Sequence, residues 1–197
     1  MQIVNTSIPG TKVIFESIRE EVPGGCSIPV ARLDNETKNS NVDKRFLPAG
    51  TPVYVDLDTN IAQVCKSSTA ITGSGAQTLR VAKNNHWKVG DLVNDQVTSA
   101  AISSITTSGA AYDTLNVAAA LVYATGTKYG QGSVSGTSVA LLYTPNGLTK
   151  DTIWIYDGNA DSAIVTVGSV REDALTFPIN ALYAAALRGT KSLITLV

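Results

Sequence analysis

Residues 163–197, AIVTVGSVREDALTFPINALYAAALRGTKSLITLV, predict a strand, a turn, a short helix and a final strand. The residues at 164–167 are mostly β-branched, which favours a strand. Across 179–187 the apolar residues recur at helical spacing, so one face of the predicted helix is apolar. Pro178 suits a first helical turn, where its missing N–H leaves no bond unmade. Gly189 is typical of the residue that follows a helix.

Strand patterns dominate the rest of the chain, so we expect a mainly β fold. Residues 53–57 and 61–66 predict a hairpin around the turn residues 58–60. Residues 47–76 and 139–197 together predict a small β-barrel or sandwich domain that carries the short C-terminal helix.

Residues 77–138 predict a small β-module inserted into that domain. Its short strand-forming segments recur about every ten residues and are separated by Gly, Asn and Asp, as is typical of a small barrel or sandwich. The Gly/Ser-rich tract 67–76 precedes the module and the tract 130–138 forms its end, and both predict flexible linkers.

Residues 1–46 predict an extended N-terminal arm. The segment 34–44, DNETKNSNVDK, is polar and aperiodic, so it cannot bury enough apolar surface to order itself alone. Four apolar residues nearer the start would be wasted on a solvated tail: Val13, Ile14, Phe15 and Ile18. We therefore expect an arm that is ordered against another protein; the alternative is a flexible terminus.

The composition argues against several classes of protein. Charged residues make up 16% of the chain, below the usual quarter, and the net charge is −1 without a basic run. Nucleic-acid binding needs clustered Lys and Arg, so we expect no nucleic-acid partner. No apolar stretch approaches the roughly 20 residues that span a bilayer, and the first residues lack a signal-peptide pattern. We expect synthesis in a cytoplasm and no membrane partner.

Residues able to do chemistry are sparse. His86 has no Cys, Asp or Glu near it at a ligand spacing, so we interpret it as a surface or packed loop residue. Residues 56–60 and 157–161 imitate the start of a calcium loop but lack its Gly and its final Glu. Cys26 and Cys65 are expected to be buried free thiols, with a disulfide as the alternative. We expect no enzyme, no catalytic residue, no metal and no cofactor.

The chain contains VREDALTFP at 170–178, followed by the predicted helix and strand, and LPAGTPV at 47–53. These short segments resemble the capsid decoration and head-fibre proteins of tailed bacteriophages. The tracts 86–91, 102–105 and 112–115 are similar to small β-modules of phage structural proteins. The resemblance covers about the first and last thirds of the chain and part of the insert.

The resemblance implies a virion structural protein on the outer surface of an icosahedral capsid, with the major capsid protein as its partner. It also implies a homo-oligomer, a trimer being favoured over a dimer. The arm residues named above would contact the capsid by strand addition. We expect the oligomer contact on the helix and the last strand, at Ile179, Leu182, Leu187, Leu193 and Leu196.

The alternative is a carbohydrate-binding surface or tail module, with host-surface glycans as the partner. Aromatic faces stack on sugar rings, and the insert carries four candidates: Trp87, Tyr112, Tyr123 and Tyr129. Aromatic residues make up 6% of the chain, which makes this alternative the less favoured one.

Overall fold

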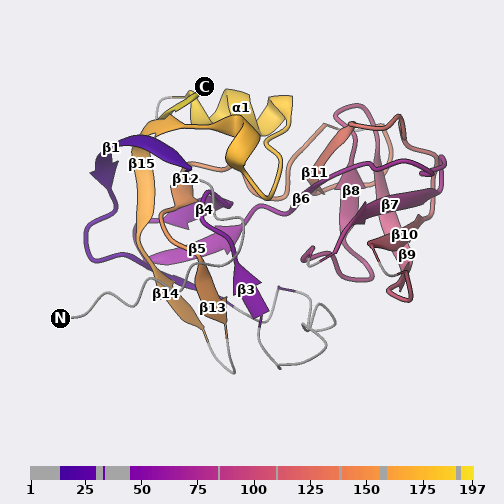
Figure 1. The fold of residues 1–197 in the computed structure, drawn as a ribbon, viewed down its shortest axis with the longest axis horizontal. Helices are drawn as coiled ribbons and strands as arrows, with labels where there is room; N and C mark the ends of the chain where they lie inside the picture. The colour runs from indigo at the N-terminus through magenta and orange to yellow at the C-terminus, as the bar shows by residue number, and fades with distance from the viewer. Residues whose placement is uncertain are drawn as a thin grey trace.

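The protein is mainly β and has two lobes that lie side by side (Figure 1). The computed structural model describes residues 14–29, 33, 45–83, 85–109, 111–137, 139–155, 159–189 and 192–197. The main lobe is built from both ends of the described chain, and the second lobe is a central insert. This confirms the predicted fold class.

The main lobe is organised around an eight-stranded sheet. Its path runs β1, β15, β12, β4, β5, β2, β14, and β16 also pairs with β15. Neighbours are antiparallel except for β2 with β5 and β15 with β16, which are parallel. The strands are β1 (Phe15–Glu21), β2 (Cys26–Ile28), β4 (Pro52–Asp56), β5 (Ile61–Val64), β12 (Gly147–Thr149), β14 (Ala160–Ser162), β15 (Ile164–Val170) and β16 (Leu193–Leu196). A separate ladder joins β3 (Arg45–Leu47) to β13 (Ile153–Ile155).

The predicted hairpin is present as β4 and β5. Val53 pairs with Val64, and Asp56 pairs with Ile61. Asn60 closes the turn with a φ of 53°, a left-handed conformation that Asn tolerates better than most residues. Alternate residues of these strands point into the core of the main lobe, as period-two patterns predict.

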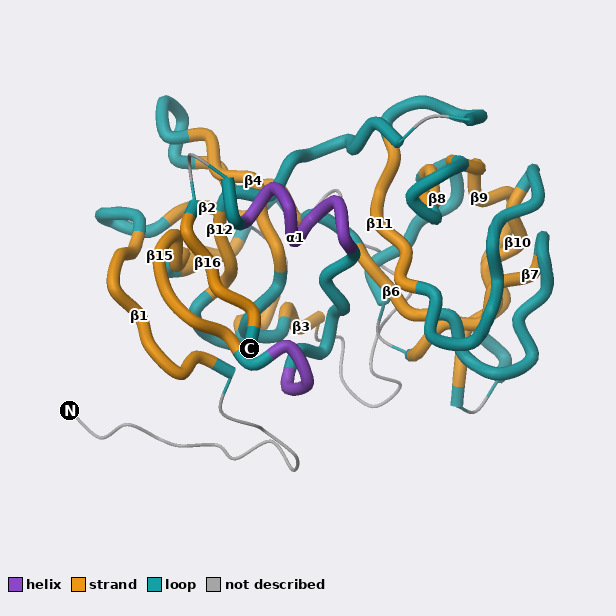
Figure 2. Tube along the Cα trace, turned by 90° about the horizontal axis from the view of Figure 1, so that it is seen from above, coloured by secondary structure: helices purple, strands orange, loops and turns teal. Residues whose placement is uncertain are grey.

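The helix α1 (Ala181–Leu187) packs against the main sheet beside β16, on the side of the lobe that faces the insert (Figures 1 and 2). Asn180 caps it, because its side-chain oxygen accepts a hydrogen bond from the backbone N–H of Tyr183 at 2.8 Å. Pro178 therefore precedes the helix, whereas the sequence had predicted this residue in the first turn. A short 3₁₀ helix, η2 (Glu172–Ala174), lies between β15 and α1.

The insert is a six-stranded sheet in the order β6, β11, β8, β9, β10, β7. The sheet curls until its ends meet, where the Ile71 N–H donates to the Arg80 carbonyl at 3.0 Å. Trp87 and Tyr129 fill the centre of this small barrel. The strands are β6 (Ser67–Thr69), β7 (Thr78–Ala82), β8 (Leu92–Asn94), β9 (Ser99–Thr106), β10 (Tyr112–Val117) and β11 (Lys128–Gly132).

The insert begins earlier than its sequence pattern indicated. Ser67 to Thr69 pair with β11 and form a barrel strand, although the small polar residues of 67–76 had predicted a linker. Ser67 and Ser68 are buried, and their short side chains fit inside the barrel because the backbone of this strand is paired. The lobes are thus joined at Lys66 and again after Gly132.

The N-terminal region also differs from its prediction. β1 pairs with β15, and β2 lies between β5 and β14, so this described part of the predicted arm belongs to the main sheet. Ile14 and Phe15 pack against the core beside α1, while Ile18 is 38% exposed. Val13 lies outside the described residues, as do most of residues 30–44. Two of the apolar residues that indicated a contact with another protein, Ile14 and Phe15, therefore pack within this chain instead.

Candidate functional site

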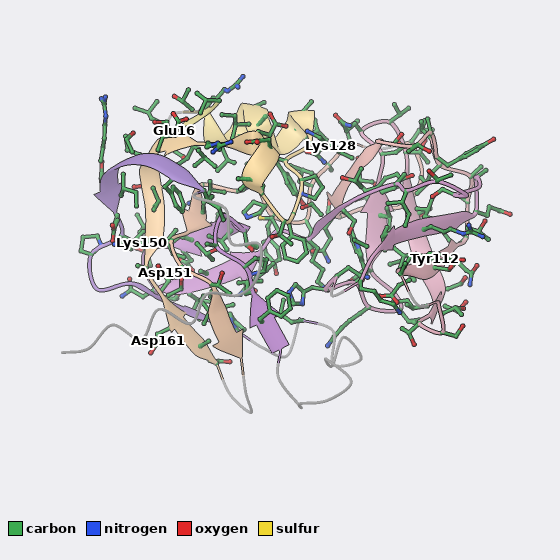
Figure 3. The ribbon with its side chains drawn as sticks, viewed as in Figure 1. Glu16, Tyr112, Lys128, Lys150, Asp151 and Asp161 are labelled. Atoms are coloured by element: carbon green, nitrogen blue, oxygen red, sulfur yellow. The ribbon has the colours of Figure 1, made fainter. Side chains whose placement is uncertain are left out.

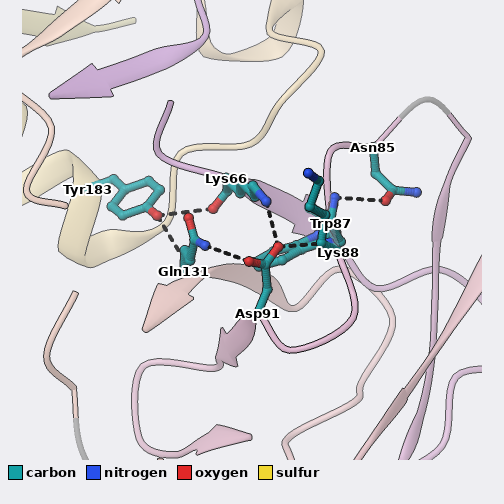
Figure 4. A network of polar contacts seen from close by, with 8 residues as sticks. Lys66, Asn85, Trp87, Lys88, Asp91, Gln131 and Tyr183 are labelled. Carbon is teal, nitrogen blue, oxygen red and sulfur yellow. Dashed lines mark hydrogen bonds and ion pairs between the residues drawn. The ribbon is translucent and has the colours of Figure 1, made fainter. Parts of the chain in front are cut away.

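A network of polar side chains lies at the junction of the two lobes (Figure 4). At its centre, the Asp91 carboxylate accepts from the Lys66 ammonium at 2.6 Å. It also accepts from the Lys88 backbone N–H at 2.8 Å and from the Gln131 side-chain amide at 3.1 Å. Asp91, which belongs to the insert, thus binds Lys66 at the first connection between the lobes and Gln131 next to the second.

Tyr183 carries the same network into the main lobe. Its hydroxyl donates to the Lys66 carbonyl at 3.0 Å and accepts from the Gln131 backbone N–H at 2.9 Å. The ring is fully buried, and burial raises the pKa of the phenol well above its usual value. The hydroxyl therefore remains a hydrogen-bond donor, and α1 is tied to both connecting segments.

The close approach of α1 to the insert needs a glycine at position 130. A Cβ atom there would lie 2.5 Å from the Asn180 side-chain nitrogen and 3.1 Å from the Tyr183 ring. Both distances are shorter than an unstrained contact. Gly130 thus lets strand β11 lie directly against the start of the helix.

A second set of contacts ties the β8–β9 turn to the main lobe. Gln96 has a φ of 79°, an uncommon backbone conformation for a residue with a side chain. Its side-chain oxygen accepts from the Ala181 N–H at 3.3 Å, in the first turn of α1. Beside it, Lys128 of the insert forms an ion pair with Glu172 of the main lobe, and Figure 3 shows Lys128 between the lobes.

Within the Lys66–Asp91 pair the lysine is almost fully shielded from water, with 4% of its side chain exposed, and the aspartate is 17% exposed. Removing one partner of such a pair leaves a charge without compensation and typically costs about 3–5 kcal/mol. The junction therefore favours one fixed orientation of the insert over a hinge. The pair was missed in the sequence, because nothing in two residues 25 positions apart indicates that they meet.

The described residues contain no group of three or more His, Cys, Asp or Glu placed to hold a metal ion. His86 is buried in the insert and contacts Phe177 of the main lobe edge-on, with ring centroids 5.4 Å apart. It is a packed loop residue, one of the two interpretations offered above.

Cys26 and Cys65 are both buried and carry free thiols. No helix of the described chain is long and apolar enough to cross a membrane.

Of the five residues predicted to form the oligomer contact, two are buried within the chain and three are at least partly exposed. Ile179, which precedes the helix, and Leu187, at its end, are both buried in the chain's own core, so this part of the predicted contact is wrong. Each such burial stabilises the fold by roughly 1.5–3 kcal/mol. Leu182 and Leu196 are half-buried, and Leu193 is 62% exposed. These three remain candidates for a contact with another chain.

The predicted glycan residues divide in the same way. Trp87 and Tyr129 are fully buried in the barrel core, so neither face can stack on a sugar, and this part of the prediction is wrong. Tyr112 is half-buried, with the Arg80 guanidinium 4.6 Å from its ring centre, and lies on the insert (Figure 3). Tyr123 is 48% exposed. The four aromatic residues therefore do not form one platform.

Comparison with known proteins adds no relative: no family model, no curated protein and no solved structure matches this chain.

Proposed function

We propose that this protein is a virion structural protein that binds the outer surface of an icosahedral phage capsid, as a decoration or head-fibre protein. The observation that carries the proposal is the fixed junction described above. A sheet domain that attaches to a lattice, and an insert held rigidly to it, would display the insert in one orientation on every copy. The short segments that resemble decoration and head-fibre proteins support the same function.

The capsid contact is proposed at residues 1–13 and the neighbouring outer edge of β1. This edge carries exposed Glu16, Arg19 and Glu20, and its pairing with β15 is interrupted by register shifts. Charges and bulges protect an edge strand against indiscriminate pairing. A specific partner strand with complementary charges would still be accepted, so the edge favours one partner over general aggregation.

The oligomer, with a trimer favoured, is proposed to form through Leu182, Leu193 and Leu196. Linking several weak strand contacts in one oligomer raises the effective concentration of each contact. Avidity of this kind would let a modest contact hold each oligomer firmly on the shell.

Deletion of residues 1–13 tests the capsid contact and leaves every strand of the described residues in the chain. We expect the truncated protein to remain folded and to lose co-sedimentation with capsids of the phage that encodes it. The matched control is the charge reversal Asp161→Lys, because Asp161 is exposed on β14, at the opposite edge of the sheet, and this variant should keep full binding. Full capsid binding by the truncated protein would refute the assignment of this segment.

A further inference from the structure

A groove of about 560 Å³ lies between α1 and the insert at the lobe junction. One wall is a side of α1, and the other is formed by the β8–β9 turn and the segment that leads into β11. Lys128 belongs to this lining, and Figure 3 shows it between the lobes. None of the four aromatic residues that the sequence predicted for sugar binding lines the groove, so it is a separate site.

The charged residues of the described lining balance one another, since Lys128 and Arg188 are matched by Asp95 and Glu172. Lys128 pairs with Glu172. Asp95 is buried, and its two carboxylate oxygens accept backbone N–H groups from the turn that follows it and from Val122. A lining without net charge gives no preference for an anion or a cation, so the ligand that fits it is neutral.

Several side chains of the lining keep hydrogen-bonding groups for a ligand. Among the described residues, the Arg188 guanidinium has no acidic partner and the Thr127 hydroxyl makes no hydrogen bond. The Lys128 ammonium uses one of its three N–H groups on Glu172, and this bond takes one of the two oxygens of the Glu172 carboxylate. The groove therefore offers both donors and acceptors.

The rest of the lining is mostly small or aliphatic, at Val122, Gly126, Ala181, Ala184 and Leu196. A sugar ring presents C–H groups on its faces and hydroxyl groups around its edge, and each hydroxyl both donates and accepts. Small side chains let such a ring approach closely enough for van der Waals contact. The lining thus matches a ligand with an apolar face and a hydroxylated edge.

We propose that this groove binds a neutral sugar residue. Its hydroxyls would bond to Arg188, Thr127 and the second oxygen of Glu172, and its C–H face would pack against Ala181 and Ala184. The volume lies within the range for ligand pockets and leaves room for about one or two sugar rings. A free sugar or one residue of a glycan chain offers this chemistry. The inference goes beyond the proposed function and does not depend on it.

A peptide backbone is also neutral and polar, but the lining favours a sugar. Extended peptides are commonly held by strand addition along a sheet edge. Most of this lining comes instead from helices and turns, so side chains rather than a strand would make the contacts.

Titration of the full chain followed by amide NMR tests the proposal, with mannose, N-acetylglucosamine and the linear trimer of each as probes. We expect saturable shifts at Thr127, Lys128 and Ala184 with at least one of the two sugars. Because the ligand carries no charge, its dissociation constant should change by less than about twofold between about 0.05 and 0.5 M NaCl. Tighter binding of the trimer would identify a glycan chain as the ligand, and equal binding would identify a free sugar.

Two variants locate the binding site. Arg188→Gln removes an exposed guanidinium, and Thr127→Val removes a hydroxyl while keeping nearly the same size of side chain. Each loses a hydrogen bond to the sugar, so we expect binding to weaken about tenfold for Arg188→Gln and about threefold for Thr127→Val.

Arg19→Gln is the matched control, since Arg19 is exposed on β1, which contributes nothing to the described lining, and this variant should bind as the wild type does. Absence of saturable binding by all four probes would overturn the proposal. So would equal binding of the neutral peptide acetyl-Gly-Ser-Gly-amide, or binding that is unchanged in both groove variants.

Discussion

The Tyr183 phenol and the Cys65 thiol are two of the buried groups whose raised pKa makes the fold sensitive to alkaline pH, together with Cys26 and Tyr129. Burial is the largest cause of the raised pKa of each group. Both therefore stay neutral in the folded protein under conditions where they ionise in the unfolded chain. An ionised phenol or thiol would be poorly solvated in the core around α1, so burial favours the neutral form of both groups.

We expect the free energy of unfolding to fall as the pH rises above about 8.5, where Cys and then Tyr begin to ionise in the unfolded chain. A raised folded-state pKa contributes stability that is complete below the unfolded-state pKa and is lost as the pH rises further. Urea unfolding at several pH values measures this dependence. Cys65→Ala should flatten the first part of the decline, and an identical profile for this variant would contradict the assignment to Cys65.

At the scale of elements, α1 and β16 share one apolar surface between folding and association. Ile179 and Leu187 are buried in the core against the sheet, whereas Leu193, on the strand β16 itself, is exposed. The helix has 7 residues, too short to be stable alone, so its packing on the sheet supplies most of its stability. What is left for another chain is a small apolar strip near the C-terminus.

Leu193→Asp tests that strip. We expect the variant to fold normally and to have a lower sedimentation coefficient, because a carboxylate replaces an exposed apolar contact between copies. Leu57→Asp is the matched control, since Leu57 is 66% exposed and follows β4 at the tip of a hairpin. Sedimentation velocity that is the same for the wild type and the Leu193 variant would count against this oligomer contact.

At the scale of the whole molecule, two lobes with separate cores are joined by hydrogen bonds at both connections between them. Tyr183 contacts Lys66 at the first crossing and Gln131 next to the second. The Gln96 contact and the Lys128–Glu172 pair lie beside them. A rigid junction is what display of the insert from a lattice would need.

Tyr183→Phe should uncouple the lobes. Removal of the hydroxyl leaves a buried carbonyl and a buried N–H without this partner, at an expected loss of about 1–3 kcal/mol. We expect hydrogen exchange to speed up at the junction in β11 and β6 more than in the barrel core around Trp87. Tyr123→Phe alters a half-exposed side chain away from this network and should leave exchange unchanged; equal protection in both variants would show that Tyr183 does not hold the junction.

Sequence patterns alone predicted the mainly β class, the hairpin of β4 and β5, the closing strand–helix–strand and the presence of a central β insert. These depend on local periodicity and turn residues, which act over a few neighbouring positions. Helix spacing over 179–187 also predicted an apolar face correctly. It could not tell whether that face meets the chain's own sheet or another chain.

Tertiary structure alone decided the place of β1 and β2, the burial of Trp87 and Tyr129, and the junction site. β1 pairs with a strand about 150 residues later, and β2 enters the same sheet between distant partners. Asp91, Lys66, Gln131 and Tyr183 meet because two lobes close on one another. Long-range pairing of this kind leaves no periodic trace in the chain, since each residue is locally compatible with many other surroundings.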